Sequence, residues 1–173
     1  MTKTKFQSTA LAYFITIRAY GTWLHGDERL SVNPKHNKIN TPKIDPNNKL
    51  HNLMRSYQKY PSVKFTKEQG EIIVDAVVSL CNQYGWRLFS IHVRTNHVHF
   101  TLRALNKKIE DVMTMVKAKT TRMLRKKGAF SGDQKIWSRH GSTKYINSDV
   151  GLYFTNDYVI ERQGQKMSYH FEP

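Results

Sequence analysis

Two histidines separated by one apolar residue form the pattern in this chain with the clearest chemical potential. His97 and His99 flank Val98 within the strand-like run HVHFTLR. Because side chains alternate along a strand, both imidazoles share one face with Thr101 and Arg103, and the apolar side chains share the other. Two neutral imidazoles are good transition-metal ligands and leave coordination positions for water and a phosphate oxygen. The pattern predicts a metal site, although a His-x-His pair on a strand is more often a solvated polar face.

A tyrosine further along the chain could attack a phosphate held at such a site. Tyr158 lies in a predicted helix over residues 149–163, and Tyr153 is the other tyrosine of that helix. A tyrosine in an amphipathic helix is more often a core residue than a nucleophile. The role of Tyr158 therefore depends on whether the fold brings it to the histidines.

The residues after Tyr158 offer an oxygen as a third metal ligand. Glu161 and Arg162 follow at i+3 and i+4, so they share the face of Tyr158 in an ideal helix. Gln163, at i+5, is rotated by roughly 140° from Tyr158, and it reaches a metal only if the last turn unwinds before Gly164. Mg²⁺ prefers oxygen ligands, whereas Mn²⁺ tolerates imidazole better.

Hydrophobic spacing and capping residues predict the elements that must position these side chains. The expected strands cover about 12–18, 86–93, 97–104 and 136–146, and the expected helices cover about 66–84, 107–127 and 149–163. The first six elements follow the order βαββαβ. This order is typical of a ferredoxin-like α+β fold, a four-stranded antiparallel sheet with helices on one face. The C-terminal helix then carries Tyr158.

The two faces of this sheet are expected to differ. Phe89, Ile91 and Val93 should point inward, towards the helices. The other face is expected to carry the histidine pair and four further residues: Trp86, Ser90, His92 and Thr101. That face stays open unless the C-terminal helix packs over it, which would bring Tyr158 towards the histidines.

The length of 173 residues predicts one domain over residues 1–173. Residues 24–64 hold many prolines, asparagines and lysines, so we interpret them as a loop-rich insert with one short helix near 50–58. No apolar run reaches the roughly 18 residues of a membrane-spanning helix. The single cysteine, Cys81, is expected to be a buried reduced thiol, which favours a soluble protein of the cytoplasm.

The charge balance favours a polyanionic partner. There are 28 Lys and Arg residues against 13 Asp and Glu residues, a formal charge of +15. Nucleic acid is the first expectation, and an anionic membrane surface is the alternative.

Two groups of residues are candidates for DNA contacts. The first group lies on the predicted helix 107–127 and comprises Lys117, Lys119, Arg122, Arg125 and Lys126. The second group lies on or before the fourth strand and comprises Trp137, Arg139, His140 and Lys144. Cations suit phosphates, and an aromatic ring among them suits stacking on an unpaired base. A solvated helix face explains most such helices, and a core position for Trp137 is equally compatible with the sequence.

Four motifs together resemble one known family. They are YGTWLHGD at 20–27, HVHF at 97–100, WSRHGSTKY at 137–145 and YVIERQG at 158–164. This combination resembles the single-tyrosine HUH transposases, and within them the REP-associated tyrosine transposase branch. The resemblance covers nearly all of the chain outside residues 28–62.

The resemblance implies metal-dependent cleavage and strand transfer of single-stranded DNA through a 5′-phosphotyrosine intermediate. It implies His97 and His99 as metal ligands and Tyr158 as the nucleophile. The family commonly places a ligand Gln four residues after the tyrosine, whereas here that position is Arg162. The third ligand is then Gln163, which we favour because Gly follows it, or Glu161.

The implied cofactor is a divalent metal, Mg²⁺ or Mn²⁺, and the implied partner is single-stranded or hairpin DNA, with no membrane. The expected form is a monomer or homodimer associated with the nucleoid. Two alternatives are a non-catalytic nucleic-acid-binding module of RNA-recognition type and an HUH replication initiator or relaxase-like nickase. The first lacks its usual signature here, because HVHFTLRA stands where an aromatic-rich strand motif is expected.

Overall fold

A computed structural model describes residues 10–28 and 44–172 of the chain, so the middle of the predicted insert lies outside the described residues. Its elements, in chain order, are β1 (Ala12–Ala19), α1 (Asn48–Ser56), α2 (Lys67–Tyr84), β2 (Arg87–Val93), β3 (His97–Arg103), α3 (Ile109–Lys126), β4 (Trp137–Ile146), α4 (Asp149–Glu161) and β5 (Ser168–Phe171). The predicted βαββαβ order is confirmed, and the predicted short helix of the insert is α1.

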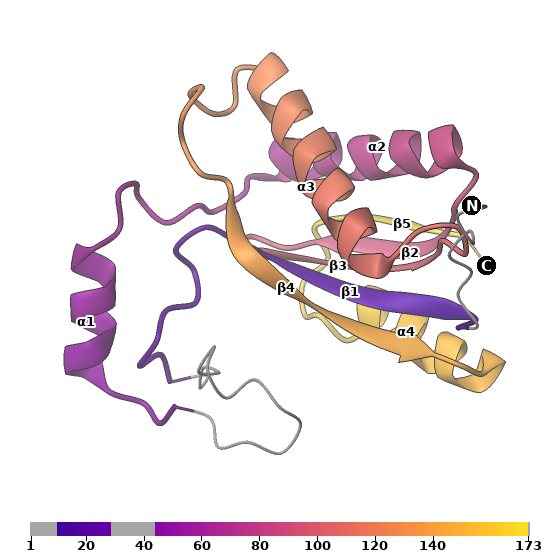
Figure 1. Cartoon of the computed structure of the whole chain (residues 1–173), viewed down its shortest axis with the longest axis horizontal. Coiled ribbons are helices and arrows are strands. Elements are labelled where there is room, and N and C mark those ends of the chain that lie inside the picture. Colours follow the sequence, from indigo (N-terminus) through magenta and orange to yellow (C-terminus); the bar gives the residue numbers. More distant parts are fainter. Residues whose placement is uncertain (1–9, 29–43, 173) are drawn as a thin grey trace, which may run out of the picture.

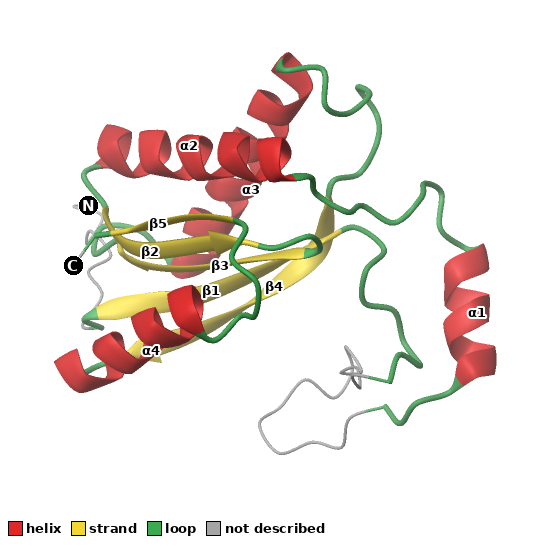
Figure 2. Cartoon of the chain, turned by 180° about the vertical axis from the view of Figure 1, so that it is seen from behind, coloured by secondary structure: helices red, strands yellow, loops and turns green. Residues whose placement is uncertain are grey.

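The sheet has the strand order β4-β1-β3-β2-β5, with every pairing antiparallel. Helices α2 and α3 cover one face, and α4 lies on the other (Figures 1 and 2). The β3 strand therefore sits in the middle of the sheet, between β1 and β2. No helix among the described residues is long and apolar enough to cross a membrane.

Helix α2 shows how local sequence sets the elements. Thr66 caps its N-terminus by accepting the Gln69 N–H, and the Gln69 side chain accepts the Thr66 N–H in return. This reciprocal cap satisfies two backbone donors that a helix start leaves unpaired. Gly85 ends the helix at φ +64°, a conformation that glycine adopts without steric cost.

The main core lies between the sheet and the pair α2 and α3. The strands contribute one face of alternating apolar side chains, including Ile15, Ile17, Ile91, Val98 and Phe100. Each of these is at most 1% exposed, so this face is fully removed from water. The burial fixes which face of β3 the histidines occupy, since a shift by one residue would exchange the faces.

A β-bulge in β2 overturns one prediction about the faces. The β2–β3 register shifts between Leu88 and Ser90, which adds one residue and reverses the alternation. Phe89 therefore joins a small cluster on the α4 side instead of pointing inward with Ile91. Trp86, predicted beside the histidines, is buried in the main core instead, where its Nε1–H donates to Asn106.

The fifth strand was not predicted from the sequence. Residues 168–171 pair with the outer edge of β2, from Val93↔Ser168 to Ser90↔Phe171. This segment is four residues long and carries no apolar run, so it has little strand signal of its own. Its pairing with a pre-formed edge makes it a strand.

Candidate active site

The face that carries the histidine pair is covered by α4 and is not open. Ser148 caps α4 by accepting the Gly151 N–H, and the helix buries Val159 and Ile160 against the sheet. These two residues pack on the sheet face that α2 and α3 leave uncovered, whereas Val150, Tyr153 and Phe154 of the same helix are exposed. This packing brings the C-terminal half of α4 over β3.

His97 and His99 lie side by side on β3, with ring centroids 4.5 Å apart. Their Nδ1 atoms are each held by a neighbour: Thr16 Oγ1 lies 2.8 Å from His99 Nδ1, and Asn96 Oδ1 lies 2.6 Å from His97 Nδ1. A partner on one ring nitrogen fixes the orientation of an imidazole and directs the other, Nε2, to a ligand. The pair is therefore oriented in advance.

Burial keeps both imidazoles neutral. It lowers the pKa of His97 to about 4 and the pKa of His99 to about 3, and the neighbouring positive charges add to the effect. A hydrogen bond with the Gln163 side chain opposes part of the shift at His97. At neutral pH both rings keep the lone pair that a metal ligand needs.

Tyr158 reaches the histidines from α4. Its ring centroid lies 5.8 Å from that of His99 and 6.0 Å from that of Phe14, in edge-on contacts. Phe14 in turn stacks on His99 at 5.3 Å. The Tyr158 side chain remains 41% exposed, so a large ligand can approach it from solvent. Residues 14, 99 and 158 thus meet at one point of the fold.

The turn after α4 places Gln163 beside His97. The helix ends at Glu161, and the Gln163 Nε2–H donates to the Tyr158 carbonyl at 3.3 Å. Gly164 then reverses the chain at φ +72°. The unwinding that Gln163 needs to face the site is therefore present.

Glu161 and Arg162 are engaged elsewhere. Glu161 binds Lys166 at 2.7 Å, and Arg162 binds Asp157 at 2.6 Å. No cluster of three His, Cys, Asp or Glu side chains within residues 10–28 and 44–172 could hold a metal ion. Of the two candidates for a third ligand, Gln163 is the one whose side chain lies at His97, and a donor set of two imidazoles and one oxygen fits Mn²⁺ or Mg²⁺.

His92 supports the site from the neighbouring strand. It is fully buried and lies directly opposite His99 in the β2–β3 register. Its Nδ1–H donates to the Val159 carbonyl at 2.9 Å, and its Nε2 accepts the Met167 N–H at 3.2 Å. His92 therefore holds the end of α4 next to Tyr158 and also the segment that follows Gln163. The sequence placed His92 on this face but could not show these two bonds.

Two of the predicted DNA contacts are part of the fold instead. The Lys117 ammonium donates to the carbonyls of Ser138, Arg139 and His140, and burial lowers its pKa. Trp137 packs against Phe65 with ring centroids 5.1 Å apart, and its Nε1–H donates to Thr120. Both side chains are half-buried and join α3 to β4, which gives each a structural role.

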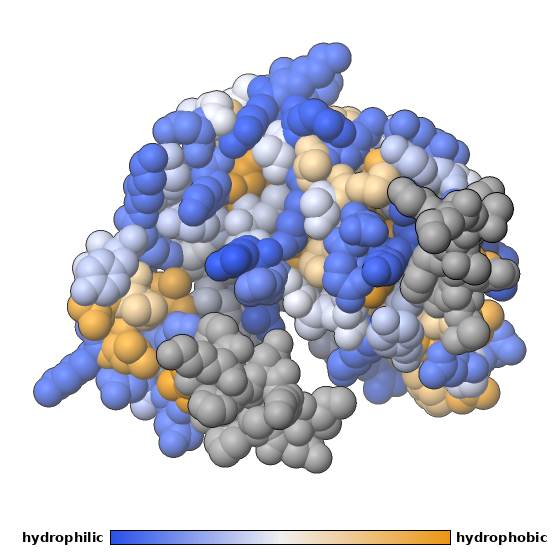
Figure 3. All heavy atoms as spheres, viewed as in Figure 1, coloured by the Kyte–Doolittle hydropathy of each residue, from blue (hydrophilic) through white to orange (hydrophobic). Residues whose placement is uncertain are grey.

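The remaining candidates divide between the two faces of the sheet. Lys119, Arg122, Arg125 and Lys126 belong to α3, on the face opposite Tyr158, where the surface is largely hydrophilic (Figures 1 and 3). Arg139, His140 and Lys144 are exposed on the edge strand β4. Lys144 lies directly opposite Phe14 in the β1–β4 register, so it shares the face of Tyr158.

Comparison with known families gives one decisive match. The family model described as "Transposase IS200 like" matches residues 47–161, which is well over half of the chain and includes both histidines and Tyr158. The chain belongs to the IS200-like transposase family. The family membership that the motifs indicated is therefore confirmed. The match begins after β1 and ends before Gln163, so it does not cover the position of the third ligand.

Two solved structures are similar to this IS200-like transposase. One is a REP-associated tyrosine transposase bound to a REP hairpin, with 10% identity, a TM-score of 0.49 and coverage of 94% of this chain and 72% of that chain. The other is a candidate transposase from Deinococcus radiodurans R1, with 14% identity, a TM-score of 0.47 and coverage of 94% and 98%. No curated protein matches the chain.

Proposed function

We propose that this transposase cleaves single-stranded DNA and rejoins it to another strand through a covalent bond to Tyr158. The observation that carries the proposal is the meeting of Tyr158, from α4, with the His97–His99 pair on β3. These elements are far apart in the chain, and the phenol lies beside two imidazoles whose pKa values are lowered by burial. The charge of +15 fits a DNA substrate.

The reaction needs only an exchange of phosphodiester bonds. The Tyr158 oxygen attacks the scissile phosphorus and loses its proton to solvent. The bond to the 3′ oxygen breaks, and that oxygen takes up a proton and leaves as a 3′-OH. A different 3′-OH then attacks the phosphotyrosine and releases Tyr158. Because one phosphoester replaces another at each step, no nucleotide hydrolysis is required.

A divalent ion, Mg²⁺ or Mn²⁺, would be held by His97, His99 and Gln163. When bound, it would neutralise charge on the scissile phosphate. The chain's own part is to orient the ligands: Thr16 and Asn96 fix the imidazoles. The bond from Gln163 Nε2 to the Tyr158 carbonyl leaves Oε1 as the ligand atom and links ligand and nucleophile directly.

Covalent capture tests the proposal. A pool of 3′-labelled oligonucleotides, each a hairpin flanked by random single-stranded tails, is incubated with the protein and Mn²⁺ or Mg²⁺, then separated under denaturing conditions. We expect a labelled protein adduct that requires the metal. Tight binding of the pool with no adduct under either metal would instead indicate a non-catalytic nucleic-acid-binding module.

His92 provides a test of how the nucleophile is positioned. His92→Leu removes the bonds to Val159 and Met167, which lie on either side of Gln163. We expect adduct formation to slow by about a hundredfold, since a misplacement near 1 Å can cost that much. His92→Asn retains a donor near the Nδ1 position and should recover part of the rate. The measurement is single-turnover adduct formation at saturating DNA, with DNA affinity determined separately. A rate unchanged in His92→Leu would contradict the role.

Salt dependence distinguishes which cations meet DNA. Affinity for single-stranded DNA should fall steeply with salt, with a slope of about 0.7 per phosphate contact. Lys144→Ala, on the Tyr158 face, should reduce the slope by about one contact. The double variant Arg122→Ala/Arg125→Ala reduces it only if DNA also wraps over α3. An unchanged slope in the double variant assigns that helix face to solvent, and an unchanged slope in Lys144→Ala removes β4 from the interface.

A further inference from the structure

A cavity of about 660 Å³ lies between α4 and the sheet, and none of His97, His99 and Tyr158 lines it. Its volume falls in the range of about 300–1,000 Å³ that is typical of ligand pockets. The apolar part of its wall is made by six residues: Leu11, Phe89, Leu152, Tyr153, Ile160 and Phe171. The reaction proposed above uses none of these side chains.

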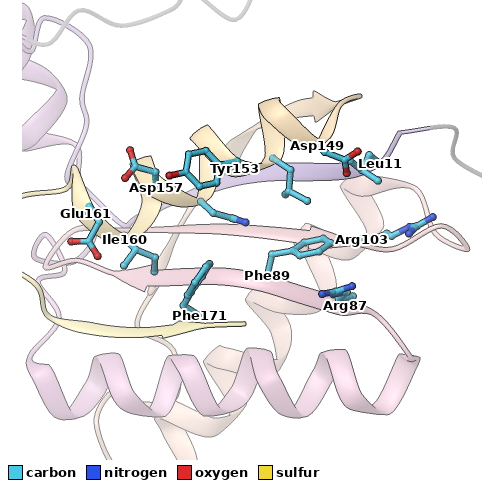
Figure 4. Close-up of a pocket in the computed structure, with 12 residues that line it drawn as sticks. Leu11, Arg87, Phe89, Arg103, Asp149, Tyr153, Asp157, Ile160, Glu161 and Phe171 are labelled. Carbon is cyan, nitrogen blue, oxygen red and sulfur yellow. The ribbon is translucent and has the colours of Figure 1, made fainter. Parts of the chain in front are cut away.

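Aromatic rings come to this cavity from both walls. Tyr153 belongs to α4, whereas Phe89 belongs to β2 and Phe171 to β5 (Figure 4). Tyr153 is 69% exposed and Phe171 is 47% exposed, so both rings are accessible to a ligand. Exposed aromatic side chains around an apolar hollow are the platforms on which unpaired bases stack.

Two arginines stand at one end of the cavity (Figure 4). Arg87 and Arg103 are direct partners in the β2–β3 register, and both are exposed. The Arg87 guanidinium lies 4.9 Å from the centroid of the Phe89 ring. Arg103 can bind a phosphate through charge-assisted hydrogen bonds.

Two of the three carboxylates that line the cavity are paired with cations of the α4 segment. Asp157 is bound by Arg162 at 2.6 Å and Glu161 by Lys166 at 2.7 Å, so both charges at the opposite end are already paired. Asp149 lies at the same end as the arginines, in the first turn of α4 (Figure 4). Arg103 is the cation of the cavity to which we assign an anion.

We propose that this cavity binds one unpaired nucleotide of the DNA strand, with its base between Tyr153 and Phe171 and its phosphate on Arg103. The inference rests on the proposed function, because it takes single-stranded DNA as the substrate. A nucleotide combines the two chemistries that the cavity offers, a flat ring and a phosphate. Since Tyr153 and Tyr158 belong to one helix, a nucleotide bound here holds the strand against the element that carries the nucleophile.

Abasic scanning tests this subsite without any cleavage step. The parent protein is Tyr158→Phe, studied in EDTA, and the probes are fluorescent 20-nucleotide single strands that each lack one base. One abasic position should weaken binding by about tenfold, as expected for one lost stacking contact. Tyr153→Ala should weaken binding of the intact strand by a similar factor and abolish the penalty at that position alone. Tyr153→Phe, which keeps the ring, should behave as the parent.

Two further variants complete the experiment. Arg103→Ala should lower the slope of log affinity against log salt by about 0.7, the value for one phosphate. Tyr57→Ala is the matched control, because Tyr57 is 72% exposed and lies at the end of α1, outside the cavity. Its affinity should equal that of the parent.

Two results would overturn the subsite. One is a Tyr153→Ala protein that binds every abasic strand as the parent does. The other is altered self-association in sedimentation velocity with unchanged DNA affinity, which would assign the cavity to a second copy of the chain. Neither depends on adduct formation by the unmodified protein, so failure of the subsite and failure of the proposed reaction are distinguishable.

Discussion

Tyr158→Phe is expected to bind single-stranded DNA normally, to form no covalent adduct and to reduce cleavage to background. The substitution removes one oxygen and keeps the ring, so the contacts with His99 and Phe14 remain. A near-isosteric change of this kind should alter the free energy of unfolding by less than about 1.5 kcal/mol. The loss therefore reports on chemistry alone. Anisotropy for binding and denaturing electrophoresis for the adduct measure the two effects separately.

Tyr145→Phe is the matched control for this prediction. Tyr145 is also exposed, and it lies opposite Tyr13 in the β1–β4 register, on the other face of the sheet. We expect this variant to form the adduct at the unmodified rate. Peptide mapping of the trapped protein should place the phosphotyrosyl bond at residue 158, and a bond at any other residue would disprove the assignment.

Loss of either site histidine should abolish metal-dependent cleavage and weaken Mn²⁺ binding by more than about a hundredfold. Loss of a residue that only hydrogen-bonds a metal ligand already weakens binding by up to about a hundredfold, and loss of the ligand itself should cost more. Alanine variants would suit histidines on an open sheet face. The structure requires a milder change, because His99 is only 8% exposed and is bonded to Thr16. His97→Asn and His99→Asn keep a polar atom near Nδ1 and remove Nε2.

Calorimetry of Mn²⁺ binding measures the effect without DNA, and thermal unfolding verifies that each variant is folded. His170→Asn is the control, since His170 lies on β5 and its side chain bonds the exposed Glu172. An exposed pair of this kind contributes little to stability. Metal binding at wild-type affinity in both His97→Asn and His99→Asn would place the metal elsewhere.

Much of the framework follows from local sequence. Thr66 and Gln69 mark the N-terminus of α2, and Gly85 marks its C-terminus. The alternation in HVHFTLR already places both histidines on one face of a strand. These features depend on neighbours within a few residues, so a pattern in the chain is sufficient to predict them.

Other features depend on partners that are distant in sequence. The bulge at Leu88–Ser90 turns Phe89 to the α4 side, and β5 exists only because β2 offers an unpaired edge. The helical spacing of Lys117 suggested a DNA contact, yet its ammonium binds three carbonyls around β4. Nothing within a few residues of these positions encodes such contacts.

The sequence by itself determined the chemistry that this protein can offer: two imidazoles side by side on a strand, a phenol on a helix, and an excess of positive charge. Only the tertiary structure decided that the parts meet. The packing of α4 over β3 sets Tyr158 against His99, and the reversal at Gly164 returns Gln163 to His97. The physical reason is that burial of Val159 and Ile160 holds α4 against the sheet, and that His92 bonds both Val159 of α4 and Met167 after the turn. The two bonds of His92 join residues more than fifty positions apart.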